Sequence, residues 1–423
     1  MRKKVDIRDV QIGMYIAELD RPWLETPFMF QGFALESTEA QQKLRELCQY
    51  VWIETDLGRD YVPTARGGQA AIARMEKLAE EEEQVKKVVR KLATEPVSSQ
   101  RKPYQDQTTF EQEIAVAKKI ESDARVAVRE TLENVQRGKK IDLQLAGKVV
   151  SRMVDSVIRN PDALVCLSYL KEVSEYTALH SIRCSILALT FGRHLALSRD
   201  EMNVVGMGAL LHDIGMARIP REILDKRTGL DASELATMRQ HVPLGLQVVK
   251  EAGGLPPGAL EIIGQHHERG EGDGYPEKRK AQMISPAGYI GSIVDVYDAI
   301  TSDRVYDNGM SAEDALKRMY EWREKDFNAA MVEDFIRCMG IFPIGSLVEL
   351  STGSVGVVIT INRARRLKPK VALVLTAGKT PYSARIVTDL LEHTDGQGKE
   401  IKINRVLPAG TYGINPMDHI VQF

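Results

Sequence analysis

The stretch VVGMGALLHDIGMARI, residues 204–219, decides the fold of the region around it. Its apolar and small residues predict a buried helix, yet the run contains the adjacent polar pair His212 and Asp213. An aspartate inside such a segment costs several kcal/mol of folding free energy unless it is paired or bound to a metal ion. The pair therefore indicates a functional site within a helical core, with His212 and Asp213 as its catalytic residues.

The histidines of the chain are concentrated around this stretch. Six of the eight lie between residues 180 and 267, where an even spread would place about two. Such clustering favours ligands over scattered core or surface histidines. With two carboxylates added, the candidate metal ligands are His180, His212, Asp213, His241, His266, His267 and Asp295. We expect all of these residues except His241 to lie in helices, and His241 to lie at a helix end.

Five imidazoles and two carboxylates exceed what one tetrahedral metal ion needs. The set suits two divalent ions with one carboxylate bridging them. Mixed imidazole and carboxylate ligation with open water positions fits iron, manganese or a similar transition metal better than a structural zinc. Two such ions can hold a phosphodiester and activate a water molecule for in-line attack on phosphorus.

Composition narrows the classes of protein that fit. Lysine and arginine number 57 against 59 aspartates and glutamates, so no basic excess points to polymeric nucleic acid as a partner. No apolar run approaches the roughly 18 residues of a membrane span, and the basic start lacks the apolar stretch of a signal peptide. The four cysteines form no C-x-x-C pair, which is typical of free thiols in a reducing compartment. We therefore expect a cytoplasmic protein without membrane contact.

Hydrophobic patterning predicts a mainly α protein with four segments. Residues 1–65 are expected to form a small mixed α/β domain in which strands flank one polar helix. Residues 66–140 are expected to be a helical linker or dimerisation segment, residues 141–340 a helical bundle domain, and residues 341–423 a β-rich extension.

The linker has two alternative interpretations. Its two long helices, expected over 69–95 and 109–137, either pack on their neighbours or form a stalk that joins two chains. The helical domain shows recurring amphipathic segments, at 143–159, 174–196, 200–214, 231–251, 258–267, 286–302 and 311–325.

Three strings within the helical domain resemble the motifs of the HD-GYP domain, a branch of the HD phosphohydrolase superfamily. They are HDIG at 212–215, HHERGEGDGYP at 266–276 and DVYDAITSDRVY at 295–306, and they occur in the family's order. The string IGMYIAELDRPWLETPF, at 12–28, resembles the small domain of unknown function that often precedes HD-GYP. The β-rich tail also resembles the extension found in such proteins.

The resemblance implies metal-dependent hydrolysis of cyclic di-GMP, a bacterial second messenger. It implies that Asp213 bridges the two ions, and that the signature loop of Gly274, Tyr275 and Pro276 lies near the site. That loop would either form a tight turn or dock diguanylate cyclase domains. The first ion would be held by His180, His212, Asp213 and Asp295, and the second by Asp213, His241, His266 and His267.

Three positions depart from the family pattern. Tyr176 stands where some members carry a glutamate that can hold a third ion, so we expect two ions. Met216 and Asp307 replace basic residues expected near the phosphate, although Arg304 is retained as a substrate-binding residue. Arg183 is a candidate replacement for the missing charge.

These losses leave three hypotheses for function. The first is slow hydrolysis of cyclic di-GMP, mainly to the linear dinucleotide, because missing cations weaken charge stabilisation in the transition state. The second is a weakly active or inactive scaffold that binds the dinucleotide or a partner. The third is a phosphodiesterase for another cyclic dinucleotide.

Overall fold

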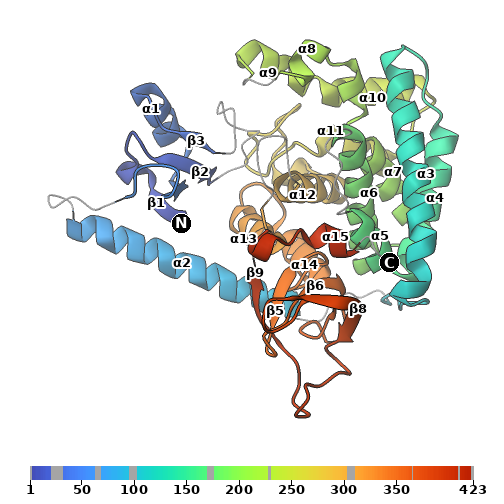
Figure 1. Cartoon of the computed structure of the whole chain (residues 1–423). Coiled ribbons are helices and arrows are strands. Elements are labelled where there is room, and N and C mark those ends of the chain that lie inside the picture. Colours follow the sequence, from blue (N-terminus) through green and yellow to red (C-terminus); the bar gives the residue numbers. More distant parts are fainter. Residues whose placement is uncertain are drawn as a thin grey trace. The chain divides into compact units, whose positions relative to one another are not determined.

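The computed structural model describes residues 2–20, 32–61, 68–94, 102–168, 176–226, 230–302, 310–363, 365–407 and 410–420. The described chain divides into two compact units. The first holds the residues up to Val88 and those of 220–238. The second holds the residues from Val89 to Ile219, from Arg239 to Ser302, and from 310 onward. The expectation of a mainly α protein with small sheets near both ends is confirmed (Figure 1).

The N-terminal part of the first unit is a four-stranded antiparallel sheet with one helix, which agrees with the expected mixed α/β character. The strand order in the sheet is β1-β4-β2-β3. Along the chain, the helix lies between strands β3 and β4. Ser37 caps the helix by accepting the N–H of Ala40, and Leu44 of that helix is buried among strand residues such as Val5 and Ile53. The elements are β1 (Arg2–Asp6), β2 (Tyr15–Leu19), β3 (Phe33–Ala34), α1 (Thr38–Leu47) and β4 (Tyr50–Glu54).

The second unit is a helical bundle followed by a sheet. The division between the units falls within α2 (Gly68–Thr94), and α8 (Arg221–Leu224) and most of α9 (Ala232–Arg239) belong to the first unit. The bundle contains α3 (Phe110–Gln136), α4 (Leu143–Arg159), α5 (Pro161–Ser168), α6 (Tyr176–His194), α7 (Arg199–Leu211), α10 (His241–Glu251), α11 (Pro257–Gln265), α12 (Pro286–Thr301), α13 (Ala312–Trp322) and α14 (Ala329–Met339).

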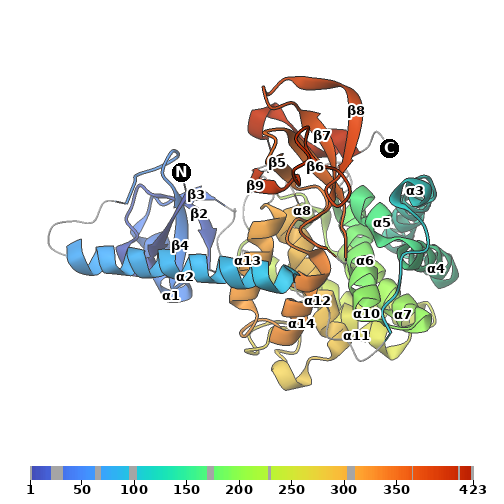
Figure 2. The same cartoon turned by 90° about the horizontal axis from the view of Figure 1, so that it is seen from below.

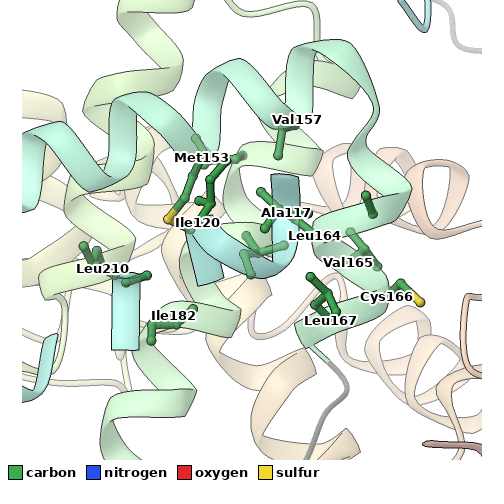
Figure 3. Close-up of a cluster of buried hydrophobic side chains, with 14 of the residues drawn as sticks. Ala117, Ile120, Met153, Val157, Leu164, Val165, Cys166, Leu167, Ile182 and Leu210 are labelled. Carbon is green, nitrogen blue, oxygen red and sulfur yellow. The ribbon is translucent and has the colours of Figure 1, made fainter. Parts of the chain in front are cut away.

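Helix α3 is part of the core of this bundle. Its apolar face is buried from Phe110 to Val135 against α4, α5 and α6. Figure 3 shows Ala117 and Ile120 of α3 among side chains such as Met153 and Leu164 from the neighbouring helices. One face of α3 is therefore buried within its own chain. The segment expected to be a linker, residues 66–140, is divided between the two units, since α2 lies largely in the first unit.

The C-terminal extension is β-rich, as expected, and packs on the bundle. Five antiparallel strands have the order β8-β7-β6-β5-β9 (Figure 2). Side chains of β6 such as Val357 and Ile359 join the same apolar cluster as α3 to α7. Asp162, in the first turn of α5, accepts the N–H of Ile361 at 2.9 Å. The elements are β5 (Leu347–Leu350), β6 (Val355–Thr360), β7 (Lys370–Leu375), β8 (Pro381–Asp389), β9 (Ile403–Leu407) and a last helix α15 (Pro416–Ile420).

Several predicted helix boundaries are wrong, and two of the errors involve proline. The expected helix 231–251 is two helices, α9 and α10, because Pro243 has no N–H for the carbonyl of Arg239 and is tolerated only in a first helical turn. Helices α5 and α14 were not predicted. Helix α5 begins at Pro161, and proline is favoured at the first position of a helix. Among the described residues, no helix is both long and apolar enough to cross a membrane.

Candidate metal centre

The candidate ligands converge from the ends and faces of several elements of the second unit. The prediction that all but His241 lie within helices is wrong for four of them, which stand just beyond helix ends. His180 is in α6 and Asp295 is in α12, whereas His241 is the first residue of α10. The four beyond helix ends are His212 and Asp213 after α7, and His266 and His267 after α11.

Gly215 accounts for the close approach of two of these elements. It lies in the 3₁₀ turn η4 (Ile214–Arg218), and a Cβ atom there would stand 1.9 Å from the carbonyl oxygen of His241 and 2.5 Å from the nitrogen of Gly245. Only glycine lets this turn lie against the start of α10. The contact brings Asp213 Oδ1 to 3.4 Å from His241 Nε2.

One group of ligand atoms surrounds the second oxygen of Asp213 and one oxygen of Asp295. His180 Nε2 lies 3.0 Å from Asp295 Oδ1 and 3.8 Å from Asp213 Oδ2. His212 Nε2 lies 3.8 Å and 3.5 Å from the same two oxygens. Two imidazoles and two carboxylates thus face a common point.

The other group surrounds Asp213 Oδ1. His241 Nε2 and His266 Nε2 lie 3.4 Å and 3.7 Å from this oxygen and 3.3 Å from each other. His267 contributes Nδ1, which is 3.8 Å from Asp295 Oδ2. Because its two oxygens face different groups, Asp213 has the position of a bridging ligand.

The hydrogen bonds of His212 and His266, and the pKa values of His212 and Asp213, suit metal ligation. The Nδ1–H groups of His212 and His266 donate to the carbonyls of Ala209 and Ile263, at 2.8 and 2.9 Å, which leaves each Nε2 with a lone pair. Burial lowers the pKa of His212 to about 4. Burial alone would raise the pKa of Asp213, but the surrounding imidazoles, His212 first among them, hold it well below its usual range.

A metal ion would also satisfy two atoms that have no partner. His212 Nε2 and Asp213 Oδ1 are buried and form no hydrogen bond with any of the described residues. Buried polar atoms are nearly always satisfied, and an unsatisfied pair at the centre of seven potential ligands favours a cation there. The residues present therefore form clusters that could hold divalent metal ions.

Comparison with known proteins agrees with these motifs and this geometry. Residues 2–146 match a domain of unknown function (DUF3391), and residues 165–330 match the HD domain. The chain is 32% identical over 390 residues to the cyclic di-GMP phosphodiesterase PA4108 of Pseudomonas aeruginosa, a match that covers 92% of this chain and 89% of the relative. The chain belongs to the HD-GYP family.

Two further similarities are shorter or weaker. The 3'3'-cGAMP-specific phosphodiesterase 2 of Vibrio cholerae is 30% identical over 164 residues, which covers 38% of this chain and 31% of that protein. The solved structure of Bd1817, an HD-GYP-type protein from Bdellovibrio bacteriovorus, aligns with 79% of this chain and 98% of its own at 15% identity and a TM-score of 0.44.

The loop that gives the HD-GYP family its name lies directly beside the ligands. A Cβ atom on Gly274 would stand 2.5 Å from both the nitrogen of Arg269 and the oxygen of His267, so this position requires glycine. The ring of Tyr275 stacks on that of His267, with centroids 4.5 Å apart and planes at 26°. Pro276 is exposed. The loop therefore packs one residue of its motif on a ligand and leaves the next in solvent.

Arg183, expected at the substrate, has a different partner. Its Nε and one terminal nitrogen donate to the two oxygens of Asp298 at 2.7 and 2.9 Å. The same carboxylate accepts the Nδ1–H of His180 at 2.7 Å. All three side chains are buried. This arrangement orients His180 and directs its Nε2 at the centre, as carboxylates do for many metal-ligating histidines.

Sequence reasoning missed Asp298 and Cys184. Asp298 follows Asp295 by three residues on α12, and Cys184 follows His180 by four on α6, so helical spacing could have found both. The sulfur of Cys184 lies 3.7 Å from each ring nitrogen of His180, and burial raises the pKa of its thiol to about 12. His194, the remaining histidine of the sequence cluster, belongs to neither ligand group.

The three departures from the family motif are only partly visible. Met216 lies in η4, is partly exposed, and donates its backbone N–H to the carbonyl of Asp213 at 2.9 Å. Tyr176 begins α6, but its side chain lies outside the described residues. Arg304 and Asp307 also lie outside them.

Proposed function

We propose that this chain hydrolyses cyclic di-GMP with a binuclear metal centre, mainly to the linear dinucleotide. The observation that carries the proposal is the convergence of five imidazoles and two carboxylates on two adjacent points that share Asp213. The full-length similarity to a cyclic di-GMP phosphodiesterase supplies the substrate. A complete ligand set favours an enzyme over a scaffold that only binds.

We propose iron or manganese as the two ions, because imidazole and carboxylate donors predominate in both groups. When bound, the ions would neutralise charge on the phosphate and activate water. The protein contributes the positions of the donors. Asp213 spans the two sites, Asp295 faces His180 and His267, and Asp298 holds the His180 ring in one orientation.

The proposed product follows from charge. The thioether of Met216, three residues after Asp213, cannot donate the charge-assisted hydrogen bond that a lysine would give to a phosphate. Cleavage of one phosphodiester leaves a terminal phosphomonoester, so the linear product carries more negative charge than the cyclic substrate and is held less well at a site with fewer cations. We therefore expect slow turnover that stops mainly after the first cut, and we expect Met216→Lys to raise kcat/KM for cyclic di-GMP.

The test is product analysis under anoxia, with the protein loaded with iron(II) or manganese(II). The proposal predicts metal-dependent release of the linear dinucleotide from cyclic di-GMP, with little mononucleotide. 3'3'-cGAMP serves as the competing substrate, since one relative is named for it. Preferential cleavage of 3'3'-cGAMP would show that this dinucleotide, and not cyclic di-GMP, is the substrate. If fully loaded protein cleaved neither dinucleotide, the proposal that the chain is an enzyme would be refuted.

We also propose a homodimer and a docking role for the signature loop. Val116 and Val126 of α3 lie outside its buried face and are 45% and 51% exposed, which leaves apolar surface for a second copy. Light scattering at tens of micromolar checks the dimer, and a monomer there would contradict it. The exposed Pro276 is the proposed contact for a diguanylate cyclase domain.

A further inference from the structure

Arg239 lies at the junction that brings His241 to the metal centre. It is the last residue of α9, and α10 begins two residues later at His241. The break at Gln240 fixes this position, because Pro243 prevents the two helices from continuing as one. A basic side chain is thereby placed beside the ligands by the same backbone feature that positions one of them.

The side chain of Arg239 stacks on the signature loop. The guanidinium carbon lies 5.1 Å from the centroid of the Tyr275 ring, a distance typical of a cation–π contact. Tyr275 in turn stacks on His267 and meets His241 edge-on, with centroids 6.1 Å apart. One aromatic ring therefore connects the arginine to two of the candidate ligands.

Arg239 differs from the other described arginines around the centre in having no polar partner. Arg183 is bound to Asp298, and Arg269 donates to the carbonyls of His266 and Glu268 at 3.0 Å each. The Nε of Arg239 is buried and unsatisfied, and no described carboxylate forms an ion pair with its guanidinium. The group is partly exposed, so an anion from solvent can reach it.

The proposed substrate has a group that suits this cation. A cyclic dinucleotide carries two phosphodiesters, and a binuclear centre holds one at a time. We propose that Arg239, held by Tyr275, binds the phosphodiester that is not being cleaved. A guanidinium suits this role because it offers several N–H donors in a fixed plane to phosphate oxygens. The inference rests on the proposed function and names a further binding residue of the same site.

The experiment compares Arg239→Gln, Arg239→Lys and wild type on two substrates. For cyclic di-GMP, Arg239→Gln is expected to lower kcat/KM about ten- to a hundredfold, mainly through KM, as expected for one charge-assisted contact. Bis(p-nitrophenyl) phosphate has a single phosphodiester, so its hydrolysis should be unchanged. Arg239→Lys should recover part of the loss. Metal content should equal that of wild type throughout.

Arg218→Gln is the matched control, because Arg218 is an exposed arginine whose partner is Glu251 at 3.5 Å. It should behave as wild type on both substrates. The inference is overturned if Arg239→Gln loses activity equally on both substrates, changes the metal content, or has no effect on cyclic di-GMP.

A binding measurement separates this inference from the proposed function. Calorimetric titration of cyclic di-GMP into metal-free protein reports affinity without turnover. Wild type that binds the dinucleotide at least tenfold more tightly than Arg239→Gln supports the inference even if the loaded protein cleaves nothing, which would refute only the proposed function. Equal affinities of wild type and Arg239→Gln would refute the role of Arg239.

Discussion

Asp298 is the residue that explains how His180 is held. Its carboxylate lies between the His180 imidazole and the Arg183 guanidinium. Burial alone would raise the pKa of Asp298, but the charge of Arg183 and the hydrogen bonds to both side chains hold it far below the usual value. An ionised carboxylate fixes the proton on Nδ1 of His180. The Nε2 atom, which lies 3.0 Å from Asp295 Oδ1, is then the one that would ligate a metal ion.

Replacement of Asp298 by asparagine should therefore weaken metal binding. We expect Asp298→Asn to reduce the affinity for one of the two ions about 10–100-fold, and activity with it, because His180 loses its orientation. Metal titration monitored by elemental analysis checks the first effect. Asp200→Asn, on the exposed start of α7, is the matched control and should bind as wild type does. Unchanged metal affinity in Asp298→Asn would show that His180 needs no such partner.

Most residues of the candidate site could be predicted from the sequence. His212 and Asp213 stand out because a polar pair interrupts an apolar run, and the histidine cluster points to the others. The structure brings all seven together. The different roles of Arg183 and Arg239 could not be predicted from the sequence. Which arginine has a carboxylate partner depends on tertiary contacts that involve α6, α12 and the signature loop.

The turn η4 and helix α10 depend on a glycine for their packing. A Cβ atom at Gly215 would overlap the carbonyl oxygen of His241, so Gly215→Ala must push α10 away from Asp213. We expect loss of metal binding and a clear decrease in melting temperature. Gly147→Ala is the control, since nothing lies within 4 Å of its Cβ position on α4 and alanine favours a helix. A Gly215→Ala protein that keeps its metal content would contradict the packing described here.

Helices α3 and α4 are joined by an ion pair whose carboxylate is buried and whose guanidinium is 32% exposed. Glu113 accepts two hydrogen bonds from Arg159, at 2.7 and 2.8 Å, and one from Ser156 at 2.8 Å. Burial alone would raise the pKa of Glu113, but these donors hold it below its usual value of 4.5. A lowered pKa means that the pair stabilises the fold fully above pH 4.5 and loses this effect as the pH falls through the folded-state pKa.

We expect Glu113→Gln to lower the free energy of unfolding by about 1.5–3 kcal/mol at neutral pH, since it removes the negative charge and one of the two oxygens that bind Arg159. The difference from wild type should shrink as the pH is lowered below 4.5, in urea titrations at several pH values. Glu133→Gln removes an exposed pair with Arg137 on the same helix and should cost less than about 1 kcal/mol. Equal effects of the two variants would contradict the buried role of Glu113.

Element boundaries were harder to predict than element types. Amphipathic periodicity runs through 231–251 without interruption, and only the missing N–H of Pro243 separates α9 from α10. The packing partner of α3 could also not be predicted, because an apolar stripe on a helix can pack on its own chain or on a second copy. Long-range burial of residues such as Phe110 and Ala117 decides this for one face and is not encoded in spacing.

At the scale of the whole molecule, the candidate ligands all belong to one unit. The seven residues fall within 180–295 and lie in the second unit, whose core also includes strands of the C-terminal sheet. The first unit contributes none of them. The metal centre is thus built on the bundle that α3 and the C-terminal sheet help to stabilise.

The most direct test of the account measures metal content and cyclic di-GMP hydrolysis together in wild type, Asp213→Ala and Asp200→Asn. Because Asp213 faces both ligand groups, its loss should affect both ions at once. The account predicts two ions per chain with turnover in wild type and in Asp200→Asn, and loss of both ions and of turnover in Asp213→Ala. An Asp213→Ala protein that retains two ions, or that cleaves the dinucleotide at the wild-type rate, would contradict it.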